Sequence, residues 1–137
     1  MRTIQQFIED AERINGKPIG FTCEPVSYRP DGNMDYMTRH FKCRITHGRR
    51  GFTLYFSQGS AHTTEPTLAD VLDCLAMDAS GYANTGYFGD WAREYGYDED
   101  SRAAEKIFRV VKRQAEQLKR TLGSEAYEAL LWETERE

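Results

Sequence analysis

SRAAEKIFRVVKRQAEQLKRTL, residues 101–122, has the pattern of one long amphipathic helix, and the expected fold is built around it. Its apolar residues recur at alternating steps of four and three: Ala104, Phe108, Val111, Ala115, Leu118 and Leu122. That spacing predicts a helix with one buried face. Three acidic residues at positions 98–100 suit the positive end of its dipole, and Gly123 is placed to end it.

An antiparallel sheet is expected before this helix. Apolar and polar residues alternate over residues 37–46, with Arg39 as the exception, and again over residues 52–57. With a turn at residues 47–51 between them, the two runs predict a hairpin with one buried face. A further strand is predicted at residues 19–23. Because Pro25 cannot donate to a ladder, that strand should lie at an edge of the sheet or end at this residue.

Three more helices follow from capping residues and apolar spacing. The first covers residues 3–14 and is capped by Thr3. A second begins after Thr67, which forms a capping box with Asp70, and ends at residues 80–81. The last one is expected to be capped by Ser124.

Irregular segments connect these elements. Turn residues occupy positions 29–33, and a polar loop of the kind that often carries function occupies positions 57–66. Residues 82–97 are rich in aromatic residues and glycine, with one short helix predicted at residues 90–95.

The sequence therefore predicts an α+β fold in a single domain, residues 1–137. We expect residues 1–80 to form an α-β-β-β-α core, with a three-stranded antiparallel sheet covered by the first two helices. The aromatic-rich segment and a C-terminal helical hairpin, residues 81–137, should pack against it or project from it.

Composition places the chain among globular proteins of the cytoplasm. Cys23, Cys43 and Cys74 are odd in number and lie in apolar patterns, so we expect reduced core thiols. Acidic residues occur where a signal peptide would be apolar, and no apolar run reaches the length of a membrane span. The net charge of −4 hides an asymmetry, because residues 36–56 and 106–120 are basic whereas residues 65–105 are mainly acidic.

The order helix, three strands, helix over the first eighty or so residues resembles that of double-stranded RNA-binding domains. In those domains, lysines at the start of the second helix bind phosphates. Here the matching positions include Glu65 and Asp70, which would repel a phosphate backbone. The resemblance therefore implies the element order and argues against that mode of RNA binding.

Two stretches resemble small proteins of bacteriophages and prophages: FTLYFSQGSAHTTEPTLADVLDCLAMDASGY, residues 52–82, and FGDWAREYGYDEDSRAAEKIF, residues 88–108. This class is similar to the one from which anti-CRISPR inhibitors and other counter-defence proteins come. The resemblance implies a protein that acts in the cytoplasm of a host cell by binding a host or mobile-element complex.

We expect no catalytic, metal-binding or cofactor-binding site. The spacings of His40, His47 and His62 match no metal signature. Ser60 lies two residues before His62, a spacing that favours a hydrogen-bonded loop over a catalytic pair. Cys43 falls on the buried side of its strand, where thiols are inert.

The exposed side of the hairpin between Arg39 and Arg50 is basic. Its candidate nucleic-acid-binding residues are His40, Lys42, Arg44, Arg49, Arg50 and Tyr55. Cations contact phosphates and a tyrosine stacks on a base, which makes this strip a candidate nucleic-acid surface. The same cations also suit a solvated sheet face that is protected from pairing with other chains.

An acidic and aromatic surface is expected if the aromatic-rich segment folds against the second helix. Its candidate partner-binding residues are Asp70, Asp73, Asp90, Trp91, Glu94, Asp98, Glu99 and Asp100. Such a surface competes with phosphates for a basic channel on a partner. The alternative is that these carboxylates start helices and keep the protein soluble.

The expected function is thus that of a non-catalytic inhibitor or adaptor, which binds a protein or nucleoprotein target through this acidic and aromatic surface. A nucleic-acid-binding module that uses the basic hairpin is the alternative. A third interpretation is a homodimer in which the apolar stripe of the long helix faces a second copy, and light scattering would detect it.

Overall fold

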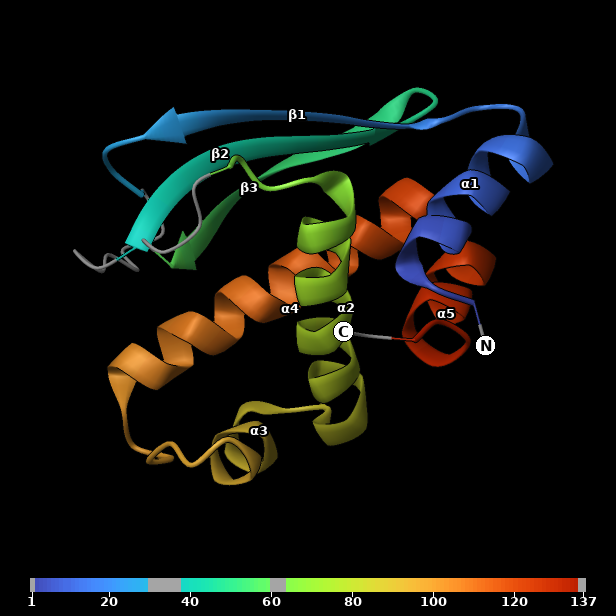
Figure 1. Cartoon of the computed structure of the whole chain (residues 1–137). Helices are drawn as coiled ribbons and strands as arrows, with labels where there is room; N and C mark the ends of the chain where they lie inside the picture. Colours follow the sequence, from blue (N-terminus) through green and yellow to red (C-terminus); the bar gives the residue numbers. More distant parts are fainter. Residues whose placement is uncertain (1, 30–37, 60–63, 136–137) are drawn as a thin grey trace.

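A computed structural model describes residues 2–29, 38–59 and 64–135 and confirms the α+β fold (Figure 1). The elements follow one another as α1 (Ile4–Asn15), β1 (Ile19–Val26), β2 (Thr38–His47), β3 (Arg50–Gly59), α2 (Leu68–Thr85), α3 (Phe88–Glu94), α4 (Arg102–Leu122) and α5 (Ser124–Trp132). Most of the predicted turn at residues 29–33 lies outside the described residues, and so do residues 60–63 of the predicted polar loop, including His62.

The three strands form an antiparallel sheet in the order β1-β2-β3. His47 pairs with Arg50, so that Gly48 and Arg49 alone make the turn between β2 and β3. Gly48 has a φ of +64°, a left-handed conformation that two-residue hairpin turns require and glycine adopts without strain. Pro25 lies in the edge strand β1 opposite Phe41, as the sequence predicts.

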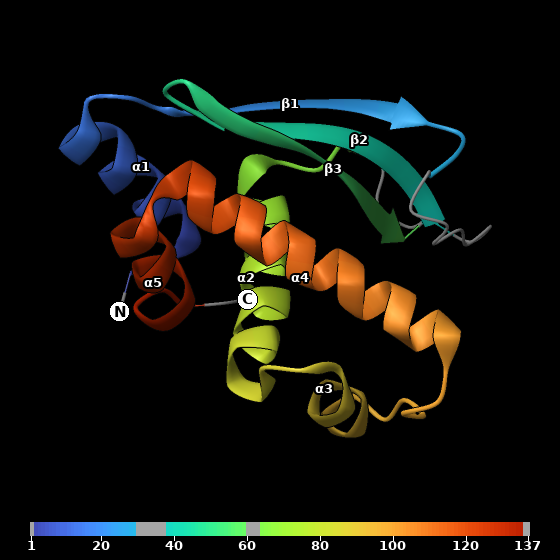
Figure 2. The same ribbon diagram turned by 180° about the vertical axis from the view of Figure 1, so that it is seen from behind.

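Helices cover one face of the sheet, but they are not the first two. In Figures 1 and 2, α2 and α4 cross below the sheet, and α4 is the helix that packs most extensively on β3 and β2. α1 lies at one end of the sheet, where it contacts α2, α5 and β1. The prediction of α1 as a covering helix is therefore wrong, because the longer apolar stripe of α4 takes that place.

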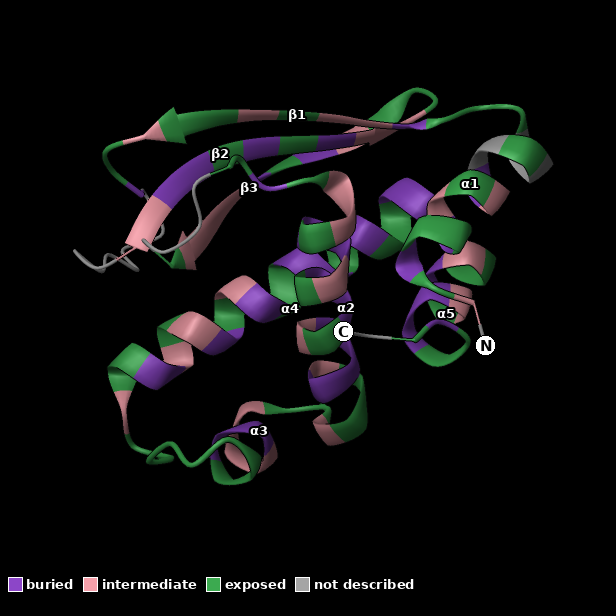
Figure 3. Cartoon of the chain, viewed as in Figure 1, coloured by how far each residue is buried: buried purple, intermediate pink, exposed green. Residues whose placement is uncertain are grey.

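The apolar stripe of α4 is buried within its own chain, and Figure 3 shows the buried residues gathered between the layers. All six predicted stripe residues are buried, and Leu118 is fully inaccessible. Ala115, Leu118 and Leu122 belong to the main apolar cluster with inward-facing residues of the sheet, such as Phe41 and Ile45, and with Leu72 of α2. Phe108 and Val111 belong to a smaller cluster with Trp91 of α3. The stripe is thus occupied by the chain itself, which removes the basis for a dimer formed through it.

The end of α2 differs from the prediction. The helix continues past Ser80 and Gly81 to Thr85. A Cβ atom at Gly81 would lie 1.9 Å from the hydroxyl oxygen of Tyr95, so the missing side chain leaves room for this tyrosine against the helix. Glycine here serves close packing within the helix and does not end it.

Two caps were predicted for α2 and α5, and only one is present. Thr67 Oγ1 accepts a hydrogen bond from the Asp70 backbone N at 3.2 Å, and the Asp70 carboxylate accepts one from the Thr67 backbone N at 2.9 Å. Ser124 is instead the first residue of α5, and Gly123 occupies the cap position without a side-chain hydrogen bond. Gly123 is the single residue between α4 and α5, so the cap position falls on it and Ser124 already lies inside the helix.

Replacing Thr67 with alanine is expected to lower the free energy of unfolding by about 1 kcal/mol, the usual cost of removing a helix cap. The matched Ser124→Ala variant should change it by less than about 0.5 kcal/mol, as for ordinary surface substitutions. Urea unfolding of both variants measures the difference. Equal losses in the two proteins would contradict the assignment of the caps.

The cysteines occupy three environments, and all are free. Cys43 is buried and Cys23, its partner in register on β1, is half-buried. Cys74 is exposed on α2, so its prediction as a core thiol is wrong. No helix in the described ranges has the length and apolar character needed to cross a membrane.

Candidate functional site

An aromatic cluster fixes α3 and the segment after it to α4. Trp91 packs between Phe108 of α4, with ring centres 5.4 Å apart, and Tyr97, whose ring stacks on it at 5.2 Å with an interplanar angle of 8°. Phe88 also contacts both Trp91 and Phe108. These contacts hold a short helix, which would not be stable alone, in one place on the molecule.

Trp91 is therefore not a surface residue. Its side chain is 5% exposed, so the prediction that it contributes to a partner-binding surface is wrong. Three tyrosines, Tyr87, Tyr95 and Tyr97, are the exposed large side chains at this end of the molecule. The sequence indicated this segment by its many aromatic residues. Their number alone does not distinguish a ring that is buried from one that is exposed.

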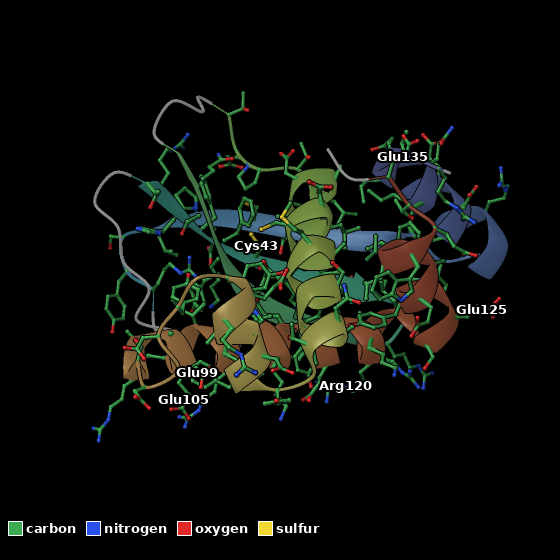
Figure 4. The ribbon with its side chains drawn as sticks, turned by 90° about the horizontal axis from the view of Figure 1, so that it is seen from below. Cys43, Glu99, Glu105, Arg120, Glu125 and Glu135 are labelled. Atoms are coloured by element: carbon green, nitrogen blue, oxygen red, sulfur yellow. The ribbon has the colours of Figure 1, made fainter. Side chains whose placement is uncertain are left out.

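Five carboxylates lie in the same segment of the chain as these tyrosines. Together they form what we call the acidic tyrosine surface: Tyr87, Asp90, Glu94, Tyr95, Tyr97, Asp98, Glu99 and Asp100. Arg93 lies in its midst and forms ion pairs with Asp90 and, at 3.1 Å, with Glu99, which links α3 to the following segment. Figure 4 shows Glu99 near Glu105 at the start of α4, well away from Arg120.

Asp70 and Asp73 do not belong to this surface. Both lie in the first two turns of α2, whereas α3 follows the opposite end of that helix (Figure 1). The 18 residues of α2 make it about 27 Å long. Asp70 is engaged in the cap with Thr67, and the predicted set of acidic residues is thus divided between two ends of a helix.

The basic strip on the hairpin is smaller than predicted. Lys42 and Arg44 are exposed on the sheet face that the helices leave open. Lys42 lies between Glu24 and the half-buried Tyr55 in register, and Arg44 donates a hydrogen bond to Thr53 Oγ1 at 3.3 Å. A carboxylate within the strip weakens its attraction for phosphates.

His40 departs most from its predicted place on that strip. Its parity on β2 predicts exposure, but the side chain is buried. Nδ1 of His40 lies 2.7 Å from Ser57 Oγ, to which Arg29 Nη1 also donates a hydrogen bond at 2.6 Å. His40 is thus part of a polar network at the end of the sheet and does not present its ring to a nucleic acid.

The tip of the hairpin joins a second basic region. Arg49 is exposed, and Arg50 Nη1 donates a hydrogen bond to the carbonyl oxygen of Arg120 at 3.0 Å. Seven cationic side chains are exposed along α4: Arg102, Lys106, Arg109, Lys112, Arg113, Lys119 and Arg120. The charge pattern of the sequence indicated this region, and the contact between Arg50 and Arg120 could not be foreseen.

Other candidates for chemistry are limited among the described residues. No group of three or more histidine, cysteine, aspartate or glutamate side chains in those ranges is arranged to hold a metal ion. Cys43 is buried as predicted, and burial raises the pKa of its thiol to about 12. The thiol is therefore protonated at neutral pH and is a poor nucleophile.

Comparison with protein-family models, with curated proteins and with solved structures finds no match to this chain. The functional argument therefore rests on the chemistry and geometry of the surfaces described above.

Proposed function

We propose that this protein is a non-catalytic binding protein that docks its acidic tyrosine surface on a basic region of a larger host or mobile-element complex. The observation that carries the proposal is the position of three exposed tyrosines beside five carboxylates at one end of the molecule. The resemblance to small phage proteins supports a counter-defence role, in which the target is a nucleic-acid-binding effector.

The chemistry of this surface suits such a partner. Tyrosine is enriched at protein interfaces because its ring buries a large area at a low cost in conformational entropy and its hydroxyl keeps a hydrogen bond. Glu94, Asp98 and Asp100 form no ion pair with any residue that the structure describes, so their charges remain available to a partner. Charge complementarity of this kind raises the association rate and favours basic partners.

Reversing three of these charges, in the variant Glu94→Lys, Asp98→Lys and Asp100→Lys, is expected to abolish inhibition of a defence complex. The measurement is the plating efficiency of a targeted phage on CRISPR-immune bacteria that express the protein, across a panel of CRISPR types. The wild-type protein should restore plating against at least one type, and the variant should lose the effect because a basic partner now meets cations.

A matched control carries the same change of charge on another part of the chain. Glu125, Glu128 and Glu133 are exposed in and just after α5 and lie outside the acidic tyrosine surface. Their joint replacement by lysine should leave inhibition intact. The proposal would be refuted if both triple variants lost inhibition equally, or if the wild-type protein inhibited no member of the panel.

Nucleic-acid binding by the hairpin and α4 is the second candidate, and the hydrogen bond from Arg50 to Arg120 favours it because it joins the two basic regions. Titration with labelled DNA and RNA at low salt separates the two functions. Salt-sensitive binding that is lost on reversing Lys42, Arg44, Arg49 and Arg113 would support the second candidate. Arg50 is left unchanged in that variant because it holds the hairpin tip on α4.

A further inference from the structure

A cavity of about 530 Å³ lies between β3, α2 and the first two-thirds of α4, apart from the acidic tyrosine surface. This volume is in the range of small-molecule sites in proteins. Leu54 of β3 and Ile107 and Val110 of α4 are among its apolar lining residues. An apolar group of the size of a leucine or phenylalanine side chain can therefore be accommodated without displacing the core.

Cationic side chains line one part of this cavity. The buried Arg29 is among its lining residues, and its hydrogen bond to Ser57 Oγ fixes the guanidinium next to β3. Lys106 extends into the lining from α4. A guanidinium and an ammonium around an otherwise apolar hollow attract a carboxylate.

A carboxylate lines the α2 side. Asp78 is half-buried and forms no ion pair with any described residue. Burial raises the pKa of Asp78 from 3.8 to about 6, and no cation opposes this shift. The charge of the Asp78 carboxylate is therefore not neutralised by Arg29 or Lys106. At neutral pH the charged carboxylate lacks the compensation that a buried charge needs, and a ligand cation would supply it.

Cys74, which lies one helical turn before Asp78 on α2, also lines the cavity. Both Arg29 and Asp78 are close enough to this thiol for their charges to act on its pKa, which burial raises to about 11. Cys74 is exposed to solvent and lines the cavity. A ligand that reaches both Arg29 and Asp78 therefore carries one anionic and one cationic group.

Gln114 adds a polar group to the lining of the cavity. Its side chain is 9% exposed, lines the cavity and makes no hydrogen bond with any residue in the described ranges. Its primary amide offers both a donor and an acceptor to a ligand. A polar ligand in the cavity would satisfy it.

We propose that this cavity binds a small zwitterion with an apolar body, of the chemical class of the apolar α-amino acids. The carboxylate of the ligand lies toward Arg29 and Lys106, its ammonium group toward Asp78, and its apolar side chain against Leu54, Ile107 and Val110. Gln114 donates to or accepts from the ligand's polar end.

Isothermal titration of the full chain at pH 7.5, where Asp78 is charged, tests this assignment. The probes are L-leucine, L-isoleucine, L-phenylalanine and L-tryptophan, together with two analogues of phenylalanine: 3-phenylpropanoate lacks the amine and phenethylamine lacks the carboxylate. At least one amino acid should bind with a Kd below about 10 mM. For L-phenylalanine, loss of either charged group should weaken binding by about tenfold or more.

Two variants and one chemical readout make the test specific. Asp78→Asn should bring the affinities for L-phenylalanine and 3-phenylpropanoate within about twofold of each other. The control Glu116→Gln, on the exposed side of α4, should leave the difference between these two affinities unchanged. A bound amino acid should slow the alkylation of Cys74 by iodoacetamide by about tenfold or more, because the thiol opens into the cavity.

Three results would overturn the assignment. The first is that none of the four amino acids binds at about 10 mM. The second is equal affinity for the amino acid and its amine-free analogue, which would indicate an anion site instead. The third is binding that neither the Asp78 substitution nor the alkylation of Cys74 affects, which would place the ligand elsewhere on the chain.

Discussion

Replacing Trp91 with alanine is expected to lower the stability of the α3 end by about 3–5 kcal/mol, the usual cost of removing a buried tryptophan. Trp91 is the centre of a second, smaller apolar cluster that includes Phe108 and Val111 and is separate from the main core. Its removal takes away the ring contacts with Tyr97 and Phe108 that hold α3 on α4. The acidic tyrosine surface should lose its fixed shape as a result.

Amide hydrogen exchange and urea unfolding together measure this effect. Because the cluster is separate, residues 88–97 should lose exchange protection while the amides of β2 remain protected. Trp132→Ala is the matched control, since that side chain is 44% exposed and belongs to neither apolar cluster. Similar losses of protection in both variants would show that Trp91 does not hold α3 in place.

Leu118→Ala should lower the free energy of unfolding by about 2–5 kcal/mol for the molecule as a whole. Leu118 is fully buried on α4 and belongs to the main cluster, in which Phe41 of the sheet and Leu72 of α2 also lie. A cavity at this position removes contacts between layers, and neighbouring side chains refill such cavities only in part.

Chemical denaturation followed by circular dichroism measures this loss. Met77→Ala is a suitable control, because Met77 is a large apolar side chain on α2 that is exposed to solvent. That control should shift the unfolding free energy by less than about 0.5 kcal/mol. A Leu118 variant as stable as the control would mean that α4 does not provide the central packing surface.

Local patterns predicted the helices and strands well where one periodic signal dominates. In α4 the apolar steps of four and three matched its buried face, and Ser101 Oγ accepts a hydrogen bond from the Ala104 backbone N at 3.1 Å at its start. The alternation along β2 and β3 likewise predicted which residues face the helices. In both cases the signal depends only on neighbours in the sequence.

Predictions failed where the deciding contact comes from a distant residue. Gly81 was expected to end α2, but the packing of Tyr95 against it is a tertiary contact that no local pattern reveals. His40 has the parity of an exposed residue and is buried because Arg29 and Ser57 form a network with it.

The candidate sites show the same limit. The sequence identified the acidic residues after α3, yet it could not separate them from Asp70 and Asp73, because that depends on the direction in which α2 leaves the sheet. The cavity was not foreseen at all. Arg29, Asp78 and Gln114 lie far apart in the sequence and line one cavity only in the folded chain.

Pro25 in the outer strand β1 has a consequence for handling the protein in concentrated solution. A strand at the border of a sheet otherwise offers a template on which fibrils extend by ladder growth. The proline ring removes one backbone donor from β1, and the neighbouring Glu24 adds an exposed charge. Storage at high concentration should therefore not promote fibrils that grow from this side of the molecule.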